Sequence, residues 1–358
     1  MKIKKADFFL LALVFGLTLF GLLIIYDASS YIAFRDFGDK YHYIKDQGIW
    51  VCIGVIAFFI CSIIDYHKFY TFALPLLMIA IALLLAVFLP GIGTGPVNGA
   101  HRWINLRAFI LQPAEFVKLT LGIYLAAWFS HKEKHRFFAF LLLMGLILLL
   151  VIAEPDLGTA IIILLEALIV YFLSGGNVQY LLGSIPIIGI IGFILVKIEP
   201  YRASRLTTFL NPNQAAVGSS YQVRQILIAL GSGGLTGVGI GNSLQKYGFL
   251  PENTTDSIFA IIAEELGFIG ASLLILCYIL LLWRGFVIAF RAKDNFGRLL
   301  AASLTSFLAV QAFVNLAAQT ALLPLTGVPL PFISYGGSAL VIDLCSVGIL
   351  FNISKQSK

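Results

Sequence analysis

The segment FFLLALVFGLTLFGLLIIY, residues 8–26, is almost entirely apolar and contains no charged residue. A transmembrane helix needs about 20 consecutive apolar residues, because an α-helix rises about 1.5 Å per residue and the hydrocarbon core of a bilayer is about 30 Å thick. Basic residues precede the segment, as in a signal peptide, but residues 27–29 (DAS) are a poor match to a cleavage site. The segment therefore predicts a retained first transmembrane helix.

The same pattern continues along the whole chain. Of the 358 residues, 59% are hydrophobic and 12% are charged, whereas soluble domains carry about 25% charged residues. Apolar runs of spanning length lie at 8–28, 48–64, 70–90, 110–130, 137–153, 158–174, 179–198, 257–283, 299–320 and 337–353. We therefore expect an all-α integral membrane protein that forms one domain, residues 1–358, with about ten transmembrane helices.

The distribution of basic residues predicts the orientation of these helices. Ten is an even number, so both termini lie on one side of the membrane. Lys and Arg are enriched in short cytoplasmic connections, and the short connection 131–136 contains three of them. This predicts that both termini are cytoplasmic and that residues 199–256, between the seventh and eighth helices, form a long extracytoplasmic loop. Within this loop, residues 226–230 are apolar but too few to cross, which suggests a re-entrant or interface-lying piece.

Several functional classes are not supported by the sequence. The four cysteines lie inside apolar runs, and the five histidines form no ligand pair at helical spacing, so we expect no structural metal site. The glycine-rich stretch 232–243 lacks the Lys-Ser/Thr ending of a phosphate loop; tight turns, or close approach to a bound headgroup, fit it better. No basic stretch interleaved with aromatic residues suggests a nucleic-acid partner.

Ionisable residues inside or beside the spans are the candidates for chemistry, because each costs several kcal/mol in the membrane unless it is paired. Glu115 and Lys118 are three residues apart in the fourth span and share one helix face. They predict an ion pair, either structural or functional. The stretch EPDLGT, residues 154–159, places two carboxylates at a membrane edge; a turn with a helix N-cap is the alternative.

The long loop contains the most informative charges. Its cations, Arg202, Arg205, Arg224 and Lys246, suggest an anionic substrate such as a lipid-linked phosphate, and contact with lipid headgroups is the alternative. Asp256 follows them at the mouth of the eighth span, where it can act as a general base or as a helix N-cap. A base beside cations suits transfer of a group from a phosphate leaving group.

Five motifs in this order resemble the FtsW/RodA family of polytopic peptidoglycan glycosyltransferases, also called the shape, elongation, division and sporulation (SEDS) family. They are GAHRWI (99–104), QPAEFVK (112–118), EPDLGT (154–159), LPENTTD (250–256) and PLPFISYGGS (329–338). The resemblance covers nearly the whole chain. The segments 96–100 and 239–246 look closer to the division member FtsW than to RodA, and a sporulation paralogue is the alternative.

The resemblance implies a reaction and its residues. The family polymerises lipid II, the sugar linked to undecaprenyl pyrophosphate, so Asp256 would remove a proton from the acceptor hydroxyl. Arg102, Arg205 and Lys246 would bind phosphate, and Glu252 is assigned to the same substrate-binding set. The Glu115–Lys118 pair would shape the cavity. The family commonly has His and Phe at the positions of Thr254 and Ser257, so a histidine that could position the aspartate is absent.

The resemblance also implies partners. The family works with class B penicillin-binding proteins in the bacterial cytoplasmic membrane, and a divalent cation (Mg or Mn) could share the charge of the leaving group. Two other functions remain open from the sequence: a lipid II flippase or other transporter, and a non-catalytic scaffold for a penicillin-binding protein. Asp256 distinguishes them, because a transferase needs its base at the outer mouth whereas a transporter needs its charges near the midplane.

Overall fold

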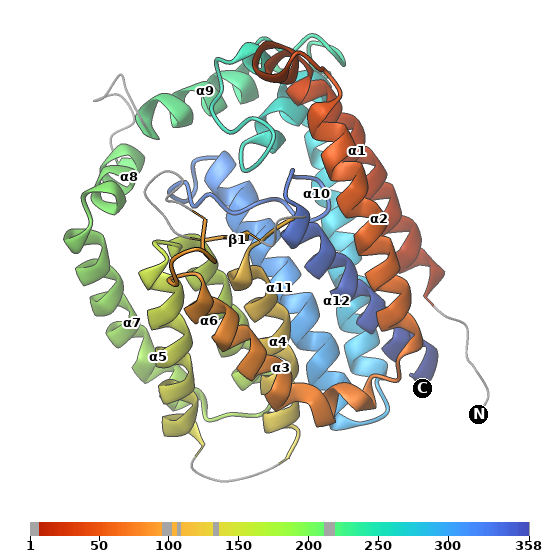
Figure 1. The fold of residues 1–358 in the computed structure, drawn as a ribbon, viewed down its shortest axis with the longest axis vertical. Helices are drawn as coiled ribbons and strands as arrows, with labels where there is room; N and C mark the ends of the chain where they lie inside the picture. The colour runs from red at the N-terminus through yellow and green to blue at the C-terminus, as the bar shows by residue number, and fades with distance from the viewer. Residues whose placement is uncertain (1–6, 95–101, 106–108, 132–135, 211–218, 358) are drawn as a thin grey trace.

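A bundle of ten long apolar helices forms the body of the protein (Figure 1). The computed structural model describes the following residues: 7–94, 102–105, 109–131, 136–210 and 219–357. Within them, the ten helices have the bounds α1 Phe8–Phe37, α2 His42–Ile63, α3 His67–Ala86, α4 Pro113–Phe129, α5 Phe137–Ala153, α6 Leu157–Leu173, α7 Val178–Ile198, α10 Ile258–Arg291, α11 Asn295–Gln319 and α12 Gly337–Gln356. The predicted all-α membrane architecture is confirmed.

The helix lengths fit a bilayer. Seven of these helices are long enough and apolar enough to span a membrane. The other three, α4, α5 and α6, have 17 residues each, which is the lower end of the spanning range. In contrast, α1 has 30 residues, and α10 has 34 including its interruption at Gly267, which is more than the roughly 20 residues that cross a bilayer core. The predicted ends at residues 28 and 283 are therefore too early, because hydropathy detects the apolar part of a helix and not its solvated extension.

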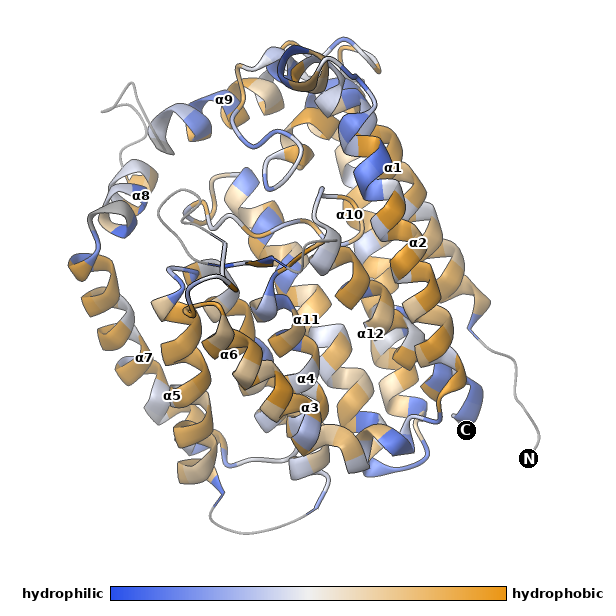
Figure 2. Cartoon of the chain, viewed as in Figure 1, coloured by the Kyte–Doolittle hydropathy of each residue, from blue (hydrophilic) through white to orange (hydrophobic). Residues whose placement is uncertain are grey.

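The bundle has a buried centre and a lipid-facing periphery. Most of α11 is buried, and it packs against α4, α6 and α10, whereas α7 has almost no buried side chains. The outer surfaces of α5 and α7 are apolar, as lipid contact requires (Figure 2). Where α12 packs along α2, Gly348 allows close approach, because a Cβ there would lie 2.6 Å from the carbonyl oxygen of Phe58.

The start of α1 and the end of α12 lie at the same side of the bundle. The backbone N–H of Asp7, just before α1, donates to Ser354 Oγ near the end of α12 at 3.3 Å, and Arg284 of α10 binds the Asp7 carboxylate. We call this side the proximal end of the bundle, and the opposite side the distal end (Figure 1). An even number of spanning helices is consistent with this arrangement.

The long loop after α7 contains helices of its own. They are α8 Pro200–Leu210, α9 Ser219–Ser232 and the short 3₁₀ helix η1 Gln245–Tyr247. In α9, Ile226 and Ala229 are buried in a cluster with Ala260 and Leu325, whereas Leu227 is exposed. The predicted apolar piece 226–230 thus lies across the distal end of α10 and α11 (Figure 1), which fits the interface-lying alternative.

The glycine-rich stretch that follows α9 pairs with a break in α10. Gly267 has φ of 66° and ψ of −167°, which interrupts the helix. The N–H groups of Val238 and Gly239 donate to the carbonyls of Glu264 and Glu265 at 3.0 Å, in place of the lost helical hydrogen bonds. Gly237 is required here, because its φ is +82° and a Cβ would lie 2.0 Å from the Glu265 oxygen. The predicted tight turns are confirmed.

A small hairpin connects α3 to α4. The strand β1, Ile104–Asn105, pairs antiparallel with β2, Ile110–Leu111. Gln112 follows β2 directly, and its backbone N–H donates to Ser338 Oγ at the start of α12. The hairpin therefore places the residues beside it, Arg102 among them, between the distal ends of α6 and α12.

Candidate active site

A cavity of about 2450 Å³ extends along the bundle from the first turns of α5 and α7 to the distal end. Its walls between α5, α6 and α7 are apolar and include Leu148, Leu164, Leu168 and Ile187. Its distal part is polar, and the ionisable residues that line it are Asp46, Arg102, Glu199, Arg202, Arg205, Tyr221, Glu252, Asp256 and Tyr335. This division matches an amphipathic ligand with a long apolar chain and a charged headgroup.

Asp256 lies at the polar end of this cavity, on the segment that precedes α10. Its side chain is 8% exposed, and Thr255 Oγ1 donates to its Oδ1 at 3.2 Å. The backbone of the segment is held from α11, where Asn315 Nδ2 donates to the Asp256 carbonyl at 3.0 Å and Gln319 donates to the same oxygen. The contacts from α11 thus fix the backbone of Asp256 at the cavity. The carboxyl group itself accepts the longer hydrogen bond from Thr255.

The loop before α12 holds the same segment from the other side. Tyr335 N–H donates to the Thr254 carbonyl at 2.9 Å, and Ser334 Oγ donates to the Thr255 carbonyl at 2.5 Å. Three successive carbonyls, those of residues 254–256, are therefore bound by side chains or backbone of distant segments. The motifs 250–256 and 329–338, separated by more than 70 residues in the sequence, form one unit in space.

Asp256 is not the N-cap of α10. The N-cap is Ser257, which makes no capping hydrogen bond with its side chain. Burial is the main cause that raises the pKa of Asp256 to about 6, Glu252 raises it further, and the Arg205 cation lowers it. A carboxyl group with a pKa near neutrality is well matched to accepting a proton during a reaction.

Three arginines line the polar end of the cavity, two from α8 and one from the segment before β1. Arg205 of α8 donates from Nη1 to the Leu325 carbonyl at 2.7 Å. Arg202, one turn earlier on α8, donates to the carbonyls of Leu195 and Ile152. Arg102, beside β1, donates to the carbonyls of residues 154 and 155. Backbone carbonyls orient these three guanidinium groups at the polar end of the cavity. A guanidinium group is well suited to binding phosphate oxygens.

The connection between α5 and α6 carries two carboxyl groups with different surroundings. Asp156 is the N-cap of α6: it accepts from Thr159 N–H at 3.1 Å and Thr159 Oγ1 at 2.8 Å. Glu154 is fully buried, and neither of its carboxyl oxygens has a hydrogen-bond partner among the described residues. Burial, followed by the nearby Asp156 carboxylate, raises the pKa of Glu154 to about 9. The N-cap alternative is confirmed for Asp156.

Lys246 does not lie where the sequence suggested. It is 4% exposed, and its Nζ binds Asp27 Oδ1 of α1 at 2.9 Å and Glu265 Oε1 of α10 at 3.1 Å. It is not among the described residues that line the cavity. The prediction that Lys246 binds substrate phosphate does not fit this position, because two carboxylates already neutralise its charge. Proximity to Asp256 in the sequence did not bring it to the same cavity.

Glu115 and Lys118 form the predicted ion pair. Lys118 Nζ lies 2.7 Å from Glu115 Oε2, and both side chains are almost completely buried. Lys118 also donates to Gln311 Oε1 of α11 at 2.6 Å. Neither residue of the pair is among the described residues that line the cavity. The pair lies in the bundle behind the cavity, where it joins α4 to α11.

Comparison with known proteins assigns the chain to a family. The family model described as "Cell cycle protein", covering FtsW, RodA and SpoVE, matches residues 8–358. The chain belongs to the FtsW/RodA/SpoVE family. Among its curated relatives in this family are stage V sporulation protein E of Bacillus subtilis, 39% identical over 100% of both chains, and a probable peptidoglycan glycosyltransferase FtsW of Geobacter sp. (strain M18), 38% identical over 100% of this chain and 99% of the relative.

Solved structures of the family have the same fold. A chain solved for the structural coordination of polymerization and crosslinking by a peptidoglycan synthase complex is 25% identical, with a TM-score of 0.83 over 99% of both chains. The crystal structure of the rod shape determining protein RodA of Thermus thermophilus is 26% identical, with a TM-score of 0.73 over 99% of both chains. Sporulation and division relatives match this chain almost equally well, so identity does not decide the predicted division subtype.

The fold of this FtsW/RodA/SpoVE member brings together four of the predicted site residues. Asp256, Glu252, Arg102 and Arg205 all line the cavity. Sequence reasoning did not select Arg202 as a site residue, although it counted this arginine among the loop cations. A usable signal was present, since residues three apart on a helix share a face, but α8 was expected to be loop.

Proposed function

We propose that this chain is a peptidoglycan glycosyltransferase that polymerises lipid II at the outer face of the bacterial cytoplasmic membrane. The observation that carries the proposal is the buried carboxyl group of Asp256, held at the polar end of a largely apolar cavity beside arginines from separate elements. The family membership and the names of the FtsW relatives support the same activity. The distal end is then extracytoplasmic, and both termini are cytoplasmic.

The reaction would be a displacement at the anomeric carbon of the donor. The 4-hydroxyl oxygen of the acceptor sugar forms the new C–O bond, and its proton passes to the Asp256 carboxylate. The bond between the anomeric carbon and the diphosphate oxygen breaks, and undecaprenyl diphosphate leaves with the electron pair. Arg102, Arg202 and Arg205 would hold the diphosphate, because guanidinium groups bind phosphate oxygens through two parallel hydrogen bonds.

The apolar part of the cavity would bind the prenyl chain. It lies between α5, α6 and α7, and α7 is the helix with the fewest buried side chains. At about 2450 Å³ the cavity exceeds the roughly 300–1,000 Å³ typical of sites for small molecules. A lipid-linked sugar is a larger ligand and fits this size. The proposed partner in the membrane is a class B penicillin-binding protein, as in the family.

A divalent cation remains part of the proposal. Mg²⁺ usually binds through one or two carboxylates together with phosphate oxygens and water, and Glu252 lines the cavity at the polar end. The described residues contain no cluster of three or more ligand-type side chains, so the substrate diphosphate would supply the remaining ligands. A bound cation would neutralise charge on the leaving group.

The test is polymerisation of lipid II by the purified protein. Lipid II in detergent or vesicles is incubated with the chain alone and with a candidate class B penicillin-binding protein, and glycan strands are separated by gel electrophoresis. Strands in either preparation, which disappear when Asp256 is replaced by Asn, are the expected result. Strands that persist at the same rate with the Asn variant would remove Asp256 from the mechanism.

Activity should fall at acid pH. The Asp256 carboxylate must be ionised to accept a proton, and its pKa is about 6. We therefore expect kcat/KM to be constant at higher pH and to decrease about tenfold per pH unit well below pH 6. The measurement is initial polymerisation rate against pH at subsaturating lipid II. A profile that is flat down to pH 4.5, in protein that stays folded, would contradict the role of Asp256.

Replacing Arg205 should shift the pH dependence of kcat/KM to higher pH. The Arg205 cation lowers the pKa of Asp256, so Arg205→Met should raise that pKa and shift the acid limb to higher pH. A lost contact to diphosphate should also raise KM. Arg205→Lys keeps the charge and should retain most of the original profile. The matched control is Arg224→Met, since Arg224 is exposed on α9 and is not among the described residues that line the cavity.

A further inference from the structure

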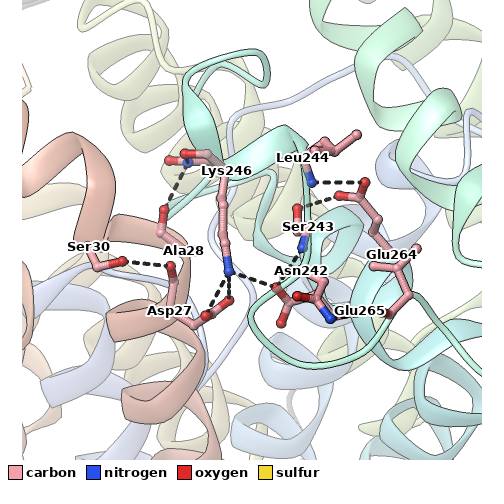
Figure 3. A network of polar contacts seen from close by, with 11 residues as sticks. Asp27, Ala28, Ser30, Asn242, Ser243, Leu244, Lys246, Glu264 and Glu265 are labelled. Atoms are coloured by element: carbon pink, nitrogen blue, oxygen red, sulfur yellow. Dashed lines mark hydrogen bonds and ion pairs between the residues drawn. The ribbon is translucent and has the colours of Figure 1, made fainter.

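A buried polar network centred on Lys246 ties the first helix to η1 and α10 (Figure 3). Lys246 Nζ binds both carboxylate oxygens of Asp27, at 2.9 and 3.1 Å, and Glu265 Oε1 at 3.1 Å. Ser243 N–H donates to Glu265 Oε1 at 3.2 Å, and Ser243 Oγ donates to Glu264. We call Asp27, Ser243, Lys246, Glu264 and Glu265 the distal brace.

The brace joins three elements that are remote in the sequence. Asp27 belongs to α1, Lys246 to η1 and Glu265 to α10. A buried ammonium group needs carboxylate partners, and buried carboxylates need a cation, so neither side of the network is stable alone. The charges therefore hold η1 in one place between α1 and α10.

Backbone contacts make the same region rigid. The stretch 233–239 pairs with α10 at its break, as described above, and Gly233 lies so close to it that a Cβ would be 2.1 Å from the Ala263 carbonyl oxygen. Phe268 N–H donates to the Gly234 carbonyl at 2.9 Å. The chain that leads into η1 thus has little freedom relative to α10, and Lys246 adds the connection to α1.

Asn253 connects the Asp256 segment to α1 and to η1. Its Nδ2 donates to the Ala28 carbonyl of α1 at 3.0 Å and to the Lys246 carbonyl at 3.4 Å. Asn253 is 3% exposed and precedes Asp256 by three residues. The Asp256 segment therefore has two sets of attachments. One set reaches α11 and the loop before α12, and the other reaches α1 through Asn253 and the distal brace.

We propose that Lys246 is a positioning residue: by binding Asp27 and Glu265 it fixes η1 and Asn253, and through them the placement of the Asp256 carboxyl group at the cavity. The inference rests on the proposed function of Asp256 as the base. It replaces the interpretation of Lys246 as a phosphate ligand, and the two make different kinetic predictions. A phosphate ligand mainly affects substrate binding, whereas a positioning residue affects the rate of the bound complex.

The experiment compares Lys246→Met, Lys246→Arg and Asp27→Asn in purified full-length protein, assayed on lipid II under the conditions in which the wild type is active. We expect Lys246→Met to lower kcat by about 10- to 100-fold, the scale of a misplaced catalytic group, and to change KM by less than about threefold. Lys246→Arg should recover part of kcat, since a guanidinium group also binds two carboxylates. Asp27→Asn, which retains the Glu265 contact, should show a smaller loss in the same direction.

A second readout does not depend on activity. Hydrogen–deuterium exchange of a peptide covering residues 250–257 should be faster in Lys246→Met and Asp27→Asn than in the wild type. The matched control is Lys45→Met, which removes an exposed lysine paired with Asp39 at 2.6 Å; it should leave kcat and the exchange of this peptide unchanged.

The outcomes separate this inference from the proposed function. Unchanged kcat with a raised KM in Lys246→Met would overturn the inference in favour of phosphate binding, and so would unchanged exchange of residues 250–257. Wild-type protein that makes no polymer with or without a transpeptidase would overturn the proposed function, and the exchange experiment would still decide whether Lys246 orders the Asp256 segment. If Lys246→Met does not fold, Asp27→Asn carries the same test.

Discussion

Asp256→Asn should abolish polymerisation of lipid II while leaving the protein folded. Asn has nearly the same shape as Asp but cannot accept a proton from the attacking hydroxyl. A positioned general base contributes about 10²- to 10⁴-fold to a rate, so we expect kcat to fall by that factor. The Thr255 contact to the side chain and the backbone contacts from α11 do not depend on the carboxylate charge, which is why expression and thermal stability should change little.

The controls for this variant distinguish the three candidate functions. Asp36→Asn removes an exposed carboxylate that pairs with Arg35, and it should polymerise at the wild-type rate. A scaffold predicts that Asp256→Asn still supports growth in a strain that lacks the native gene. A flippase predicts that lipid II still crosses the membrane in vesicles made with the Asn variant. Growth without polymerase activity would contradict the transferase proposal.

The membrane architecture could be predicted from the sequence because it depends on composition alone. Each of the ten apolar runs became a helix, since backbone groups in lipid must be paired within their own segment. The boundaries could not be predicted equally well. α1 continues through Arg35 and Asp36. A hydropathy profile ends the predicted helix before these charged residues, although a helix can continue through them outside the bilayer. The helices α8 and α9 were missed because short amphipathic segments leave no apolar run of spanning length.

Some residues of the candidate site could be selected from the sequence, whereas the surroundings of Lys246 could not. Asp256 and Arg205 could be selected because Asp256 lies in the motif 250–256 at the mouth of a predicted span, and Arg205 is one of the cations of the long loop. Lys246 has the same local signature, yet Asp27, which neutralises it, lies 219 residues away in the sequence. A single sequence gives no indication of such a partner. The charge of a residue is therefore predictable, and whether that charge is already satisfied is not.

The buried pair of Glu115 and Lys118 should be the most sensitive point for stability. Lys118 is completely buried and makes contact with Glu115 and Gln311. Lys118→Met would leave the Glu115 carboxylate without its cation in a medium that solvates it poorly. Removing one partner of a buried pair costs about 3–5 kcal/mol. We expect a loss of this size in the free energy of unfolding, measured by denaturant or thermal unfolding in detergent.

A double variant tests whether the cost comes from the stranded charge. Replacing both partners, Glu115→Gln with Lys118→Met, removes the unpaired carboxylate, and replacement of a whole buried pair is often neutral. It should therefore recover most of the stability that Lys118→Met loses. Lys45→Met serves as the exposed comparison and should cost less than about 1 kcal/mol. If the double variant is as unstable as Lys118→Met, packing around the lysine stem, rather than charge, holds α4 against α11.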